Sequence, residues 1–372
     1  MSHLSLVSSK LLIGLALLAS PPSFTTDSAL ARNEAPTAPP GATPPTTATG
    51  QRIQAVINEA HRKFASNQEG KNADYIPVLK QVDPKLFGIV VATVDGQVFQ
   101  VGDAAHPFSI QSVAKVFTLS LLMQQIGADG VEKKIGVNAT GLPFNSIIAI
   151  ENDPKHLPGN PLVNPGAITA VSLLNAPSAE AKWDSIIKTY SAFAGHELTV
   201  DQPVYKSESE TNTRNRAIAT LLKAYEVLKG DPGEALDIYT RECSVSVTAR
   251  DLAIMGATLA NGGVNPMTGQ RVMDEKNVPG VLAVMSTAGL YENSGEWSFN
   301  VGLPAKSGVG GGIVAIVPGK FAIGTFSPPL DDAGNSVRGQ KAVEYISKAL
   351  GVDLYQPHAQ PPRQARTPSR VH

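Results

Sequence analysis

The sequence predicts an α+β fold in which an antiparallel β-sheet, built from both ends of the chain, is flanked by helices and joined to a helical lobe. A hairpin pattern lies near the start, at residues 87–101, and strand patterns return at residues 297–326. Residues 112–289 between them are mostly helical in pattern. Because strands and helices do not alternate, this arrangement is favoured over a parallel, doubly wound sheet.

The first predicted elements are a helix and a hairpin. A helix over residues 51–66 is indicated by apolar residues at helical spacing, namely Ile53, Val56, Ile57 and Ala60. Residues 87–94 are rich in β-formers, Asp95-Gly96 is a turn dipeptide, and residues 97–101 resume the strand pattern. We therefore expect two antiparallel strands joined by a tight turn.

The central block begins with a helix over residues 112–125, which carries Val116, Leu119, Leu122 and Met123. A second helix begins at Asn164-Pro165, where a capping residue precedes a first-turn proline. A third covers residues 214–229, and a fourth covers residues 248–260. The fourth opens with a capping box and is followed by two glycines, at Thr248, Asp251 and Gly262-Gly263.

Strand patterns follow at residues 297–303, 313–317 and 321–326, and a last helix covers about residues 337–350. These strands must find partners, and the hairpin near the start is the other strand-rich part of the chain. We therefore expect one sheet assembled from both chain ends.

Composition and charge exclude several classes of function. Of the 372 residues, 42% are apolar and 17% are charged, and the formal net charge is −1. This apolar content supports a sizeable core, whereas the near-neutral charge argues against binding to nucleic acid or to an anionic membrane surface. The single cysteine, Cys243, excludes an internal disulfide and a cysteine-based zinc site; we expect it to be a small, buried packing residue.

The N-terminus resembles an export signal. Lys10 supplies a positive charge, residues 11–19 form an apolar run, and Ala29-Leu30-Ala31 offers a small-x-small cleavage site before Arg32. The run is shorter than the ~20 residues that span a bilayer, so no stable membrane insertion is expected. The pattern predicts a signal peptide over residues 1–31 and a periplasmic or secreted protein.

Two further segments are predicted to lie outside the fold. Residues 32–50 are rich in Pro, Thr and Ala and predict an extended linker. Residues 353–372 predict a disordered tail rich in Pro and Arg. One folded domain over residues 51–352 is predicted between them.

Ser112 and Lys115 form a Ser-x-x-Lys motif at the start of an apolar helix. A spacing of three places both side chains on one helix face. A lysine can take the serine proton if burial or a neighbouring cation lowers its pKa, and the helix N-terminus favours developing negative charge. Ser185 and Lys188 match the same pattern, and Ser112 can also be a simple capping serine, so context must decide.

Lys306-Ser307-Gly308 is a second motif, followed by three more glycines before the strand at Ile313. Glycines beside a strand allow another backbone or a ligand to approach closely, although a flexible turn has the same composition. The pair of Ser-x-x-Lys with Lys-Ser-Gly is a signature of penicillin-recognising serine enzymes.

The chain resembles the serine-dependent glutaminase family, whose fold is similar to that of β-lactamases and penicillin-binding proteins. The matching stretches cover about residues 51–350 in the family's order. They are GKNADYIP (70–77), FSIQSVAK (108–115), NPLVNPGAI (160–168), Ser207-Glu208, TNTRN (211–215), CSVSVTARDL (243–252), NGGVNPMTG (261–269), GLYENSGEWSF (289–299) and GLPAKSGVGGGI (302–313).

The resemblance implies hydrolysis of L-glutamine to L-glutamate and ammonia. Ser112 would attack the side-chain amide to form a γ-glutamyl ester, with Lys115 as its base, and the backbone N–H groups of Ser112 and Val309 would form an oxyanion hole. Tyr291 and Tyr75 match positions beside the reacting group, and which of them relays a proton stays open. The family also implies a homodimer or homotetramer.

The resemblance also implies a set of residues for the two charged ends of free glutamine. Glu208 would bind the α-ammonium. Asn164, Asn215 and Tyr239 would donate to the α-carboxylate without an arginine, and Asn164 at a helix start suits an anion. Gln111 matches a substrate-contacting position. From the residues alone, Asn164 could be only a cap, and Glu208 and Asn215 could be solvated helix-end residues.

No cofactor or metal is indicated. The seven histidines include no His-x-x-x-His pair, and the one glycine cluster leads into a strand instead of a helix. Two other functions compete with glutamine hydrolysis. One is a penicillin-interactive enzyme, although no Ser-Asp-Asn element is present, and the other is a non-catalytic amino-acid-binding protein.

Overall fold

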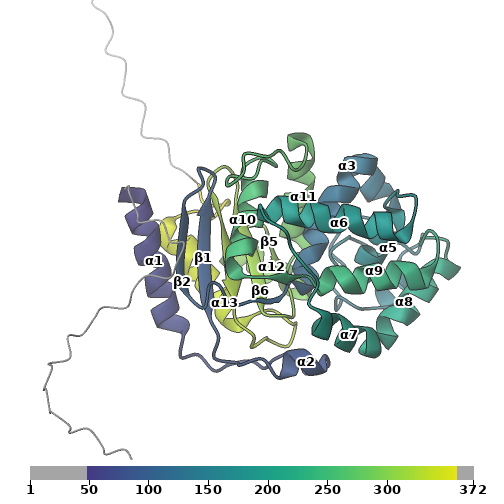
Figure 1. The fold of residues 1–372 in the computed structure, drawn as a ribbon, viewed down its shortest axis with the longest axis horizontal. Coiled ribbons are helices and arrows are strands. Elements are labelled where there is room, and N and C mark those ends of the chain that lie inside the picture. Colours follow the sequence, from purple (N-terminus) through teal and green to yellow (C-terminus); the bar gives the residue numbers. More distant parts are fainter. Residues whose placement is uncertain (1–47, 358–372) are drawn as a thin grey trace, which may run out of the picture. The chain divides into compact units, whose positions relative to one another are not determined.

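The computed structural model describes residues 48–357 (Figure 1). The predicted signal peptide, most of the predicted linker and most of the predicted tail lie outside the described residues. The first helix, α1 (Ala48–Phe64), begins slightly earlier than its pattern predicts. None of the helices between residues 48 and 357 is both long enough and apolar enough to cross a membrane.

The main sheet has five strands in the order β2-β1-β7-β6-β5, and every neighbouring pair is antiparallel. The prediction of one sheet from both chain ends is therefore confirmed, because β1 pairs directly with β7. The strands are β1 (Gly88–Thr93), β2 (Val98–Gly102), β5 (Ala305–Ser307), β6 (Gly312–Val317) and β7 (Phe321–Phe326). Asp95-Gly96 forms the predicted turn, with Gly96 at a φ of 85°.

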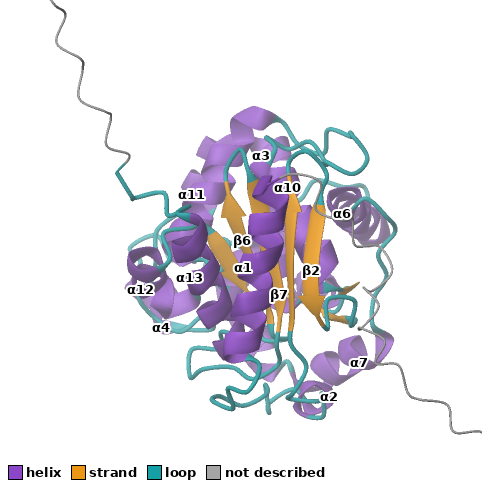
Figure 2. Ribbon diagram, turned by 90° about the vertical axis from the view of Figure 1, so that its left-hand side faces the viewer, coloured by secondary structure: helices purple, strands orange, loops and turns teal. Residues whose placement is uncertain are grey.

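Both faces of the sheet are largely buried, which explains why apolar residues occupy successive positions along β1, β6 and β7 instead of alternating with polar ones. In β1, Ile89 and Val91 contribute to one apolar cluster, whereas Val90 and Ala92 contribute to another. Helices α1 and α13 (Val337–Leu350) cover the first face (Figure 2). Helix α10 (Ala249–Ala260) packs against β1, β6 and β7 from the second face.

The helical lobe lies between β2 and β5 in sequence and carries most of the remaining helices (Figure 1). Helix α3 (Ala114–Lys134) packs against α5 and α6, and α9 packs against α5 and α8. A short ladder pairs β3 (Phe108–Ser109), which leads into α3, with β4 (Ser246–Val247), which leads into α10. The other helices are α2 (Pro77–Lys80), α4 (Ile148–Asn152), α5 (Asn164–Leu173), α6 (Ala179–Ala194), α7 (Gln202–Thr211), α8 (Thr213–Ala224), α9 (Pro232–Cys243) and α11 (Val278–Ala288).

The strand predicted over residues 297–303 is wrong, because its first part is helix α12 (Ser294–Asn300). The alternation of Trp297, Phe299 and Val301 resembles a strand with one buried face. In the structure Trp297 and Val301, four residues apart, are buried on one side, while Phe299 is 88% exposed. The predicted helix at 214–229 is also too long, since α8 ends at Ala224.

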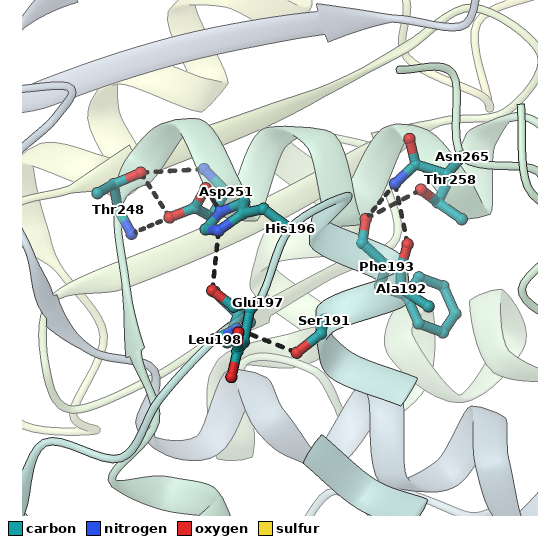
Figure 3. A network of polar contacts seen from close by, with 10 residues as sticks. All are labelled: Ser191, Ala192, Phe193, His196, Glu197, Leu198, Thr248, Asp251, Thr258 and Asn265. Atoms are coloured by element: carbon teal, nitrogen blue, oxygen red, sulfur yellow. Dashed lines mark hydrogen bonds and ion pairs between the residues drawn. The ribbon is translucent and has the colours of Figure 1, made fainter. Parts of the chain in front are cut away.

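Hydrogen bonds at both ends of α10 tie this central helix to the end of α6 (Figure 3). At the N-terminus, Thr248 and Asp251 form the predicted capping box, and His196 Nε2 donates to Asp251 Oδ1 at 2.8 Å. Beyond the C-terminus, Asn265 Nδ2 donates to the Phe193 carbonyl at 2.9 Å. These contacts fix the lobe against the helix that supports the sheet.

Candidate active site

Ser112 and Lys115 lie one turn apart at the start of α3, as their spacing predicts. Ser112 belongs to a short 3₁₀ turn, η1 (Gln111–Val113), that runs directly into the helix. Lys115 Nζ lies 2.8 Å from Ser112 Oγ and donates to Asn164 Oδ1 at 2.6 Å. A serine hydroxyl is thus held against an amine in a geometry suited to proton transfer.

The second Ser-x-x-Lys motif, formed by Ser185 and Lys188, has neither the burial nor the serine–lysine contact of the first. Ser185 lies on the middle of α6 and donates its hydroxyl hydrogen bond to the Ala181 carbonyl at 3.0 Å, whereas Lys188 is exposed. The structure therefore separates the two motifs by burial and by hydrogen bonding, which the motif alone could not do.

Burial makes Lys115 a better base at neutral pH. Its side chain is 1% exposed, and loss of solvation lowers its pKa to about 8, against the opposing influence of Cys243, Glu242 and Glu208. Cys243 is buried, as predicted, and burial raises the pKa of its thiol. The Lys115 Nζ also lies 5.5 Å from the centre of the Tyr239 ring.

Eight of the nine residues predicted to bind substrate line one small cavity of about 110 Å³. They are Tyr75, Gln111, Ser112, Asn164, Glu208, Asn215, Tyr239 and Val309. The residues come from the segment before α2, from η1, from the helices α5, α7, α8 and α9, and, for Val309, from the loop between β5 and β6. The ninth, Tyr291, is buried and packs against the cavity wall, with 4.7 Å between the centres of its ring and that of Phe144, and the Ser112 side chain influences the pKa of its hydroxyl.

Glu208 supplies a buried carboxyl group to the cavity. Gln111 Nε2 donates to Glu208 Oε2 at 3.1 Å and to Ser109 Oγ at 3.2 Å. Burial raises the pKa of Glu208 to about 7, against the lowering effects of Gln111 and Lys115. Glu208 is therefore not the solvated helix-end residue that its sequence position allows, and it is available to a cationic ligand group.

Asn164 does not cap its helix. It is the first residue of α5, Val163 stands at the capping position, and no side-chain cap is made. Instead the Asn164 side chain joins two site residues, because its Oδ1 accepts from Lys115 and its Nδ2 donates to Asn215 Oδ1 at 3.0 Å. The polar side chain is thus turned from its own helix end toward the cavity.

The glycine-rich loop after Ser307 packs closely on the segment that carries Ser112. A Cβ atom at Gly308 would lie 2.8 Å from the Ile110 carbonyl oxygen and 3.2 Å from the Ser112 nitrogen, and one at Gly310 would lie 2.4 Å from the Ser109 oxygen. The glycines therefore allow two backbones to meet, as their pattern indicates. Among residues 48–357, no group accepts a hydrogen bond from the backbone N–H of Val309.

Two site residues have backbone angles in the left-handed region, which side chains other than glycine rarely adopt. Gln111 has a φ of 50° and Tyr291 a φ of 57°. Such conformations cost about 1–3 kcal/mol each and concentrate at functional sites. Tyr291 lies in the turn η3 (Tyr291–Asn293), burial raises the pKa of its phenol, and its hydroxyl donates to the Ser307 carbonyl at 3.4 Å.

The sequence reasoning missed part of the cavity wall. Phe144, Asn145 and Arg214 line the cavity, and Arg214 Nε donates to the Asn145 carbonyl at 2.9 Å. Arg214 is adjacent to the predicted site residue Asn215 and belongs to the same TNTRN stretch, so the sequence contained a reason to include Arg214 in the site. The loop before α4 that holds Phe144 offered no such signal, because its position depends on tertiary contacts. Within the described part of the chain, no group of three or more His, Cys, Asp or Glu residues is placed to hold a metal ion.

The fold and the buried serine–lysine pair define a class of protein, the serine-dependent enzymes of the β-lactamase-like fold. Comparison with known proteins is more specific. The model of the family described as Glutaminase matches residues 70–355. A glutaminase of Colwellia psychrerythraea is 55% identical over 303 residues, which cover 82% of this chain and 97% of that protein.

Solved structures agree with this comparison. A probable glutaminase, ybaS, has a TM-score of 0.81 and 46% identity, covering 82% of this chain and 99% of the other. A probable glutaminase from Bacillus subtilis, complexed with 6-diazo-5-oxo-L-norleucine, has a TM-score of 0.72 and 30% identity, covering 82% and 96%. The chain belongs to the glutaminase family and is an enzyme of that family, a hydrolase.

Proposed function

We propose that the protein hydrolyses L-glutamine to L-glutamate and ammonia through a γ-glutamyl ester of Ser112. The observation that carries the proposal is the 2.8 Å approach of Lys115 Nζ to Ser112 Oγ in the cavity that Glu208 also lines. A nucleophile, its base and a carboxylate for an ammonium group are thereby brought together. The family of the chain and the names of its relatives point to the same substrate.

In the first half-reaction, uncharged Lys115 accepts the Ser112 proton as Oγ attacks the side-chain amide carbon. The tetrahedral intermediate places its negative oxygen on the N–H groups of Ser112 and Val309. The C–N bond then breaks, and ammonia leaves with a proton returned from Lys115, directly or through the Tyr291 hydroxyl. In the second half-reaction, water gives up a proton to the same groups, attacks the ester and releases L-glutamate and the free serine.

The cavity also suits the zwitterionic end of free glutamine. Glu208 faces the α-ammonium group, and Asn164, Asn215 and Tyr239 offer donors to the α-carboxylate. The relative from Bacillus subtilis was solved with 6-diazo-5-oxo-L-norleucine, an α-amino acid, which supports a ligand with this end group. A cavity of about 110 Å³ is small, which favours a single amino acid over a peptide.

The competing function is that of a penicillin-interactive enzyme, which the Ser-x-x-Lys and Lys-Ser-Gly motifs favour. The test incubates the purified protein with L-glutamine and, separately, with a chromogenic cephalosporin. We expect ammonia from glutamine and no colour from the cephalosporin; the reverse result would overturn the proposal. Ser112→Ala should abolish ammonia release yet keep glutamine binding in calorimetry, whereas Ser185→Ala, the matched control, should change neither.

We also propose that the protein is exported and assembles as a homodimer or homotetramer. The signal pattern of residues 1–31 supports export, and the family resemblance supports self-association. Mass spectrometry of protein from the producing cell should give a mature N-terminus near Arg32, and light scattering should give twice or four times the mass of one chain. Retention of residues 1–31, or a monomeric mass, would contradict the respective proposal.

A further inference from the structure

The loop between β7 and α13, residues 327–336, packs on the cavity wall although it contributes no residue to the cavity lining. A Cβ atom at Gly334 would lie 3.4 Å from Val309 Cγ1 and 3.7 Å from Tyr291 Cε2. It would also lie 3.8 Å from Phe144 Cε1. Val309 and Phe144 line the cavity, and the Tyr291 ring packs on Phe144. The loop is therefore placed to support the groups on which the proposed chemistry depends.

Asn335 of this loop is 0% exposed, and its side-chain amide joins two segments of the site. Its Oδ1 accepts from Ser307 Oγ at 2.5 Å, and its Nδ2 donates to the Leu290 carbonyl at 3.5 Å. A carbonyl can only accept, so the NH₂ of the amide faces Leu290 and the amide oxygen faces Ser307. Ser307 ends β5 and stands two residues before Val309. Leu290 directly precedes Tyr291 in the chain.

These contacts close a ring of hydrogen bonds around Tyr291. The Tyr291 hydroxyl donates to the Ser307 carbonyl at 3.4 Å, the Ser307 hydroxyl donates to Asn335, and Asn335 donates to the Leu290 carbonyl. A tyrosine at a φ of 57° persists only where its surroundings impose that conformation. The ring supplies this constraint, because it holds both the hydroxyl of Tyr291 and the backbone that leads into it.

The backbone of Asn335 is fixed by contacts outside the site. Its N–H donates to Asp331 Oδ1 at 2.8 Å, and its carbonyl accepts from the Asp331 N–H at 2.8 Å. Gln340 of α13 donates to the other carboxylate oxygen of Asp331 at 2.8 Å. The next residue, Ser336, caps α13 by accepting from the Gly339 N–H. Asn335 is thus anchored to α13, which gives its amide a fixed place beside the site.

We propose that Asn335 is a positioning residue that fixes the Val309 N–H and the Tyr291 hydroxyl for the chemical steps. It acts on the first group through Ser307 and on the second through Leu290. The inference rests on the proposed function, which assigns these two groups to the oxyanion hole and to proton transfer. Because both groups act on the reacting amide, the effect of Asn335 falls on the chemical steps.

Substrate binding depends on other contacts. Glu208, the proposed partner of the α-ammonium, lies on α7, and Gln111 is its hydrogen-bond donor. Among residues 48–357, no side chain of the 327–336 loop hydrogen-bonds to Glu208. A substitution of Asn335 is therefore expected to change kcat and to leave KM for L-glutamine nearly constant.

The experiment measures kcat and KM for L-glutamine in Asn335→Ala, with Asn265→Ala as the matched control. Asn265 is also 0% exposed and also donates to a backbone carbonyl, that of Phe193, but it does not line the cavity (Figure 3). We expect Asn335→Ala to lower kcat by roughly 10²-fold, since a displacement of ~1 Å can cost that much. Asn265→Ala should keep the wild-type kcat. An unchanged kcat in Asn335→Ala, or a change confined to KM, would overturn the proposal.

Ser307→Ala removes the same hydrogen bond from its other end and should also lower kcat. Residues that share an interaction have non-additive effects, so the double variant should be about as slow as Asn335→Ala alone. Losses that multiply in the double variant would show that the two residues act independently, which contradicts the proposal. If Asn335→Ala fails to fold, Ser307→Ala decides alone, because it removes a single hydroxyl; a wild-type kcat would then overturn the proposal.

Labelling of Ser112 by a fluorophosphonate separates this inference from the proposed substrate. The negative oxygen that forms on phosphorus uses the same N–H donors as the intermediate of amide hydrolysis. We expect slower labelling in Asn335→Ala than in wild type and in Asn265→Ala, even if L-glutamine releases no ammonia. Equal labelling rates in the three proteins would overturn the role of Asn335 and leave the glutamine assignment intact.

Discussion

The amide of Gln111 occupies the carboxylate of Glu208, with Nε2 donating to Oε2 at 3.1 Å. This buried pair gives one oxygen of the Glu208 carboxylate a hydrogen-bond donor from within the protein. A substrate ammonium must compete with the Gln111 amide for Glu208, and a charged donor has the advantage because its hydrogen bonds to a carboxylate are stronger. Gln111 makes this contact with a backbone φ of 50°, in the left-handed region that residues other than glycine rarely adopt.

The first prediction concerns Glu208→Gln. The variant lacks the negative charge for the α-ammonium, and a hydrogen bond to a charged group contributes about 1.5–3 kcal/mol, so KM for L-glutamine should rise roughly 10–150-fold. The smaller effect should fall on kcat, since the reacting atoms are untouched. Steady-state ammonia release measures both, with exposed Glu210→Gln on the same helix as the control. An unchanged KM would show that Glu208 does not bind the α-ammonium group.

The second prediction concerns the pH dependence of kcat/KM. Two groups must lose a proton before free enzyme can act, Lys115 with a pKa of about 8 and Glu208 with a pKa of about 7. The logarithm of kcat/KM should therefore rise with a slope of two below pH 7 and a slope of one up to pH 8. In Glu208→Gln the steeper part should disappear. A single slope throughout the wild-type profile would show that one of the two groups does not need to be deprotonated.

The chain order and the periodicities were enough to predict four of the five strands of the sheet, all except β5, and the helices α1, α10 and α13 that flank it. The hairpin at Asp95-Gly96 and the capping box at Thr248 depend only on residues that are close in sequence, so they can be predicted without knowledge of tertiary contacts. Trp297 and Val301 were misassigned because a short apolar alternation is shared by strands and amphipathic turns of helix. The exposure of Phe299, which decides between them, is a tertiary property.

The candidate site was predictable to the extent that its residues stand in recognisable stretches. The Ser112–Lys115 spacing indicated their contact, but the burial that lowers the Lys115 pKa depends on helices distant in sequence. The left-handed backbone of Gln111 and Tyr291 was not predictable, because neither residue favours it intrinsically. Lys306 belongs to a recognisable motif, but its two hydrogen-bond acceptors, the carbonyls of Gly289 and Ser307, could be identified only from the structure.

The third prediction concerns Glu242, a fully buried residue of α9 that interacts electrostatically with Lys115. Its Oε2 accepts from Thr118 Oγ1 at 2.5 Å, its Oε1 has no partner among the described residues, and burial raises its pKa to about 7. The folded protein thus holds this proton more tightly than the unfolded chain, where the pKa is about 4.5. The Glu242 contribution to stability is therefore fully present below pH 4.5 and is lost as pH rises to about 7.

Glu242→Gln cannot ionise and should escape that loss. Between pH 4.5 and 7 the free energy of unfolding of the wild type should fall relative to the variant by roughly 2–3 kcal/mol, given about 1.4 kcal/mol per pKa unit. Urea denaturation of both proteins across this range provides the measurement, with Glu210→Gln as the exposed control. A constant difference between the two proteins would show that Glu242 has an ordinary pKa.

The last prediction tests the close approach of the glycine-rich loop to the nucleophile. In Gly308→Ala the new methyl group would meet the Ile110 oxygen at 2.8 Å and the Ser112 nitrogen at 3.2 Å, so the two proposed oxyanion donors, on Ser112 and Val309, must move apart. Loss of one such donor costs roughly 10²–10³-fold in kcat, and we expect a fall of this size with little change in KM. Gly295→Ala is the matched control, because its Cβ atom would meet nothing within 4 Å. If Gly308→Ala keeps its kcat while its melting temperature falls, the close packing supports the fold alone and the oxyanion hole must be sought elsewhere in the cavity.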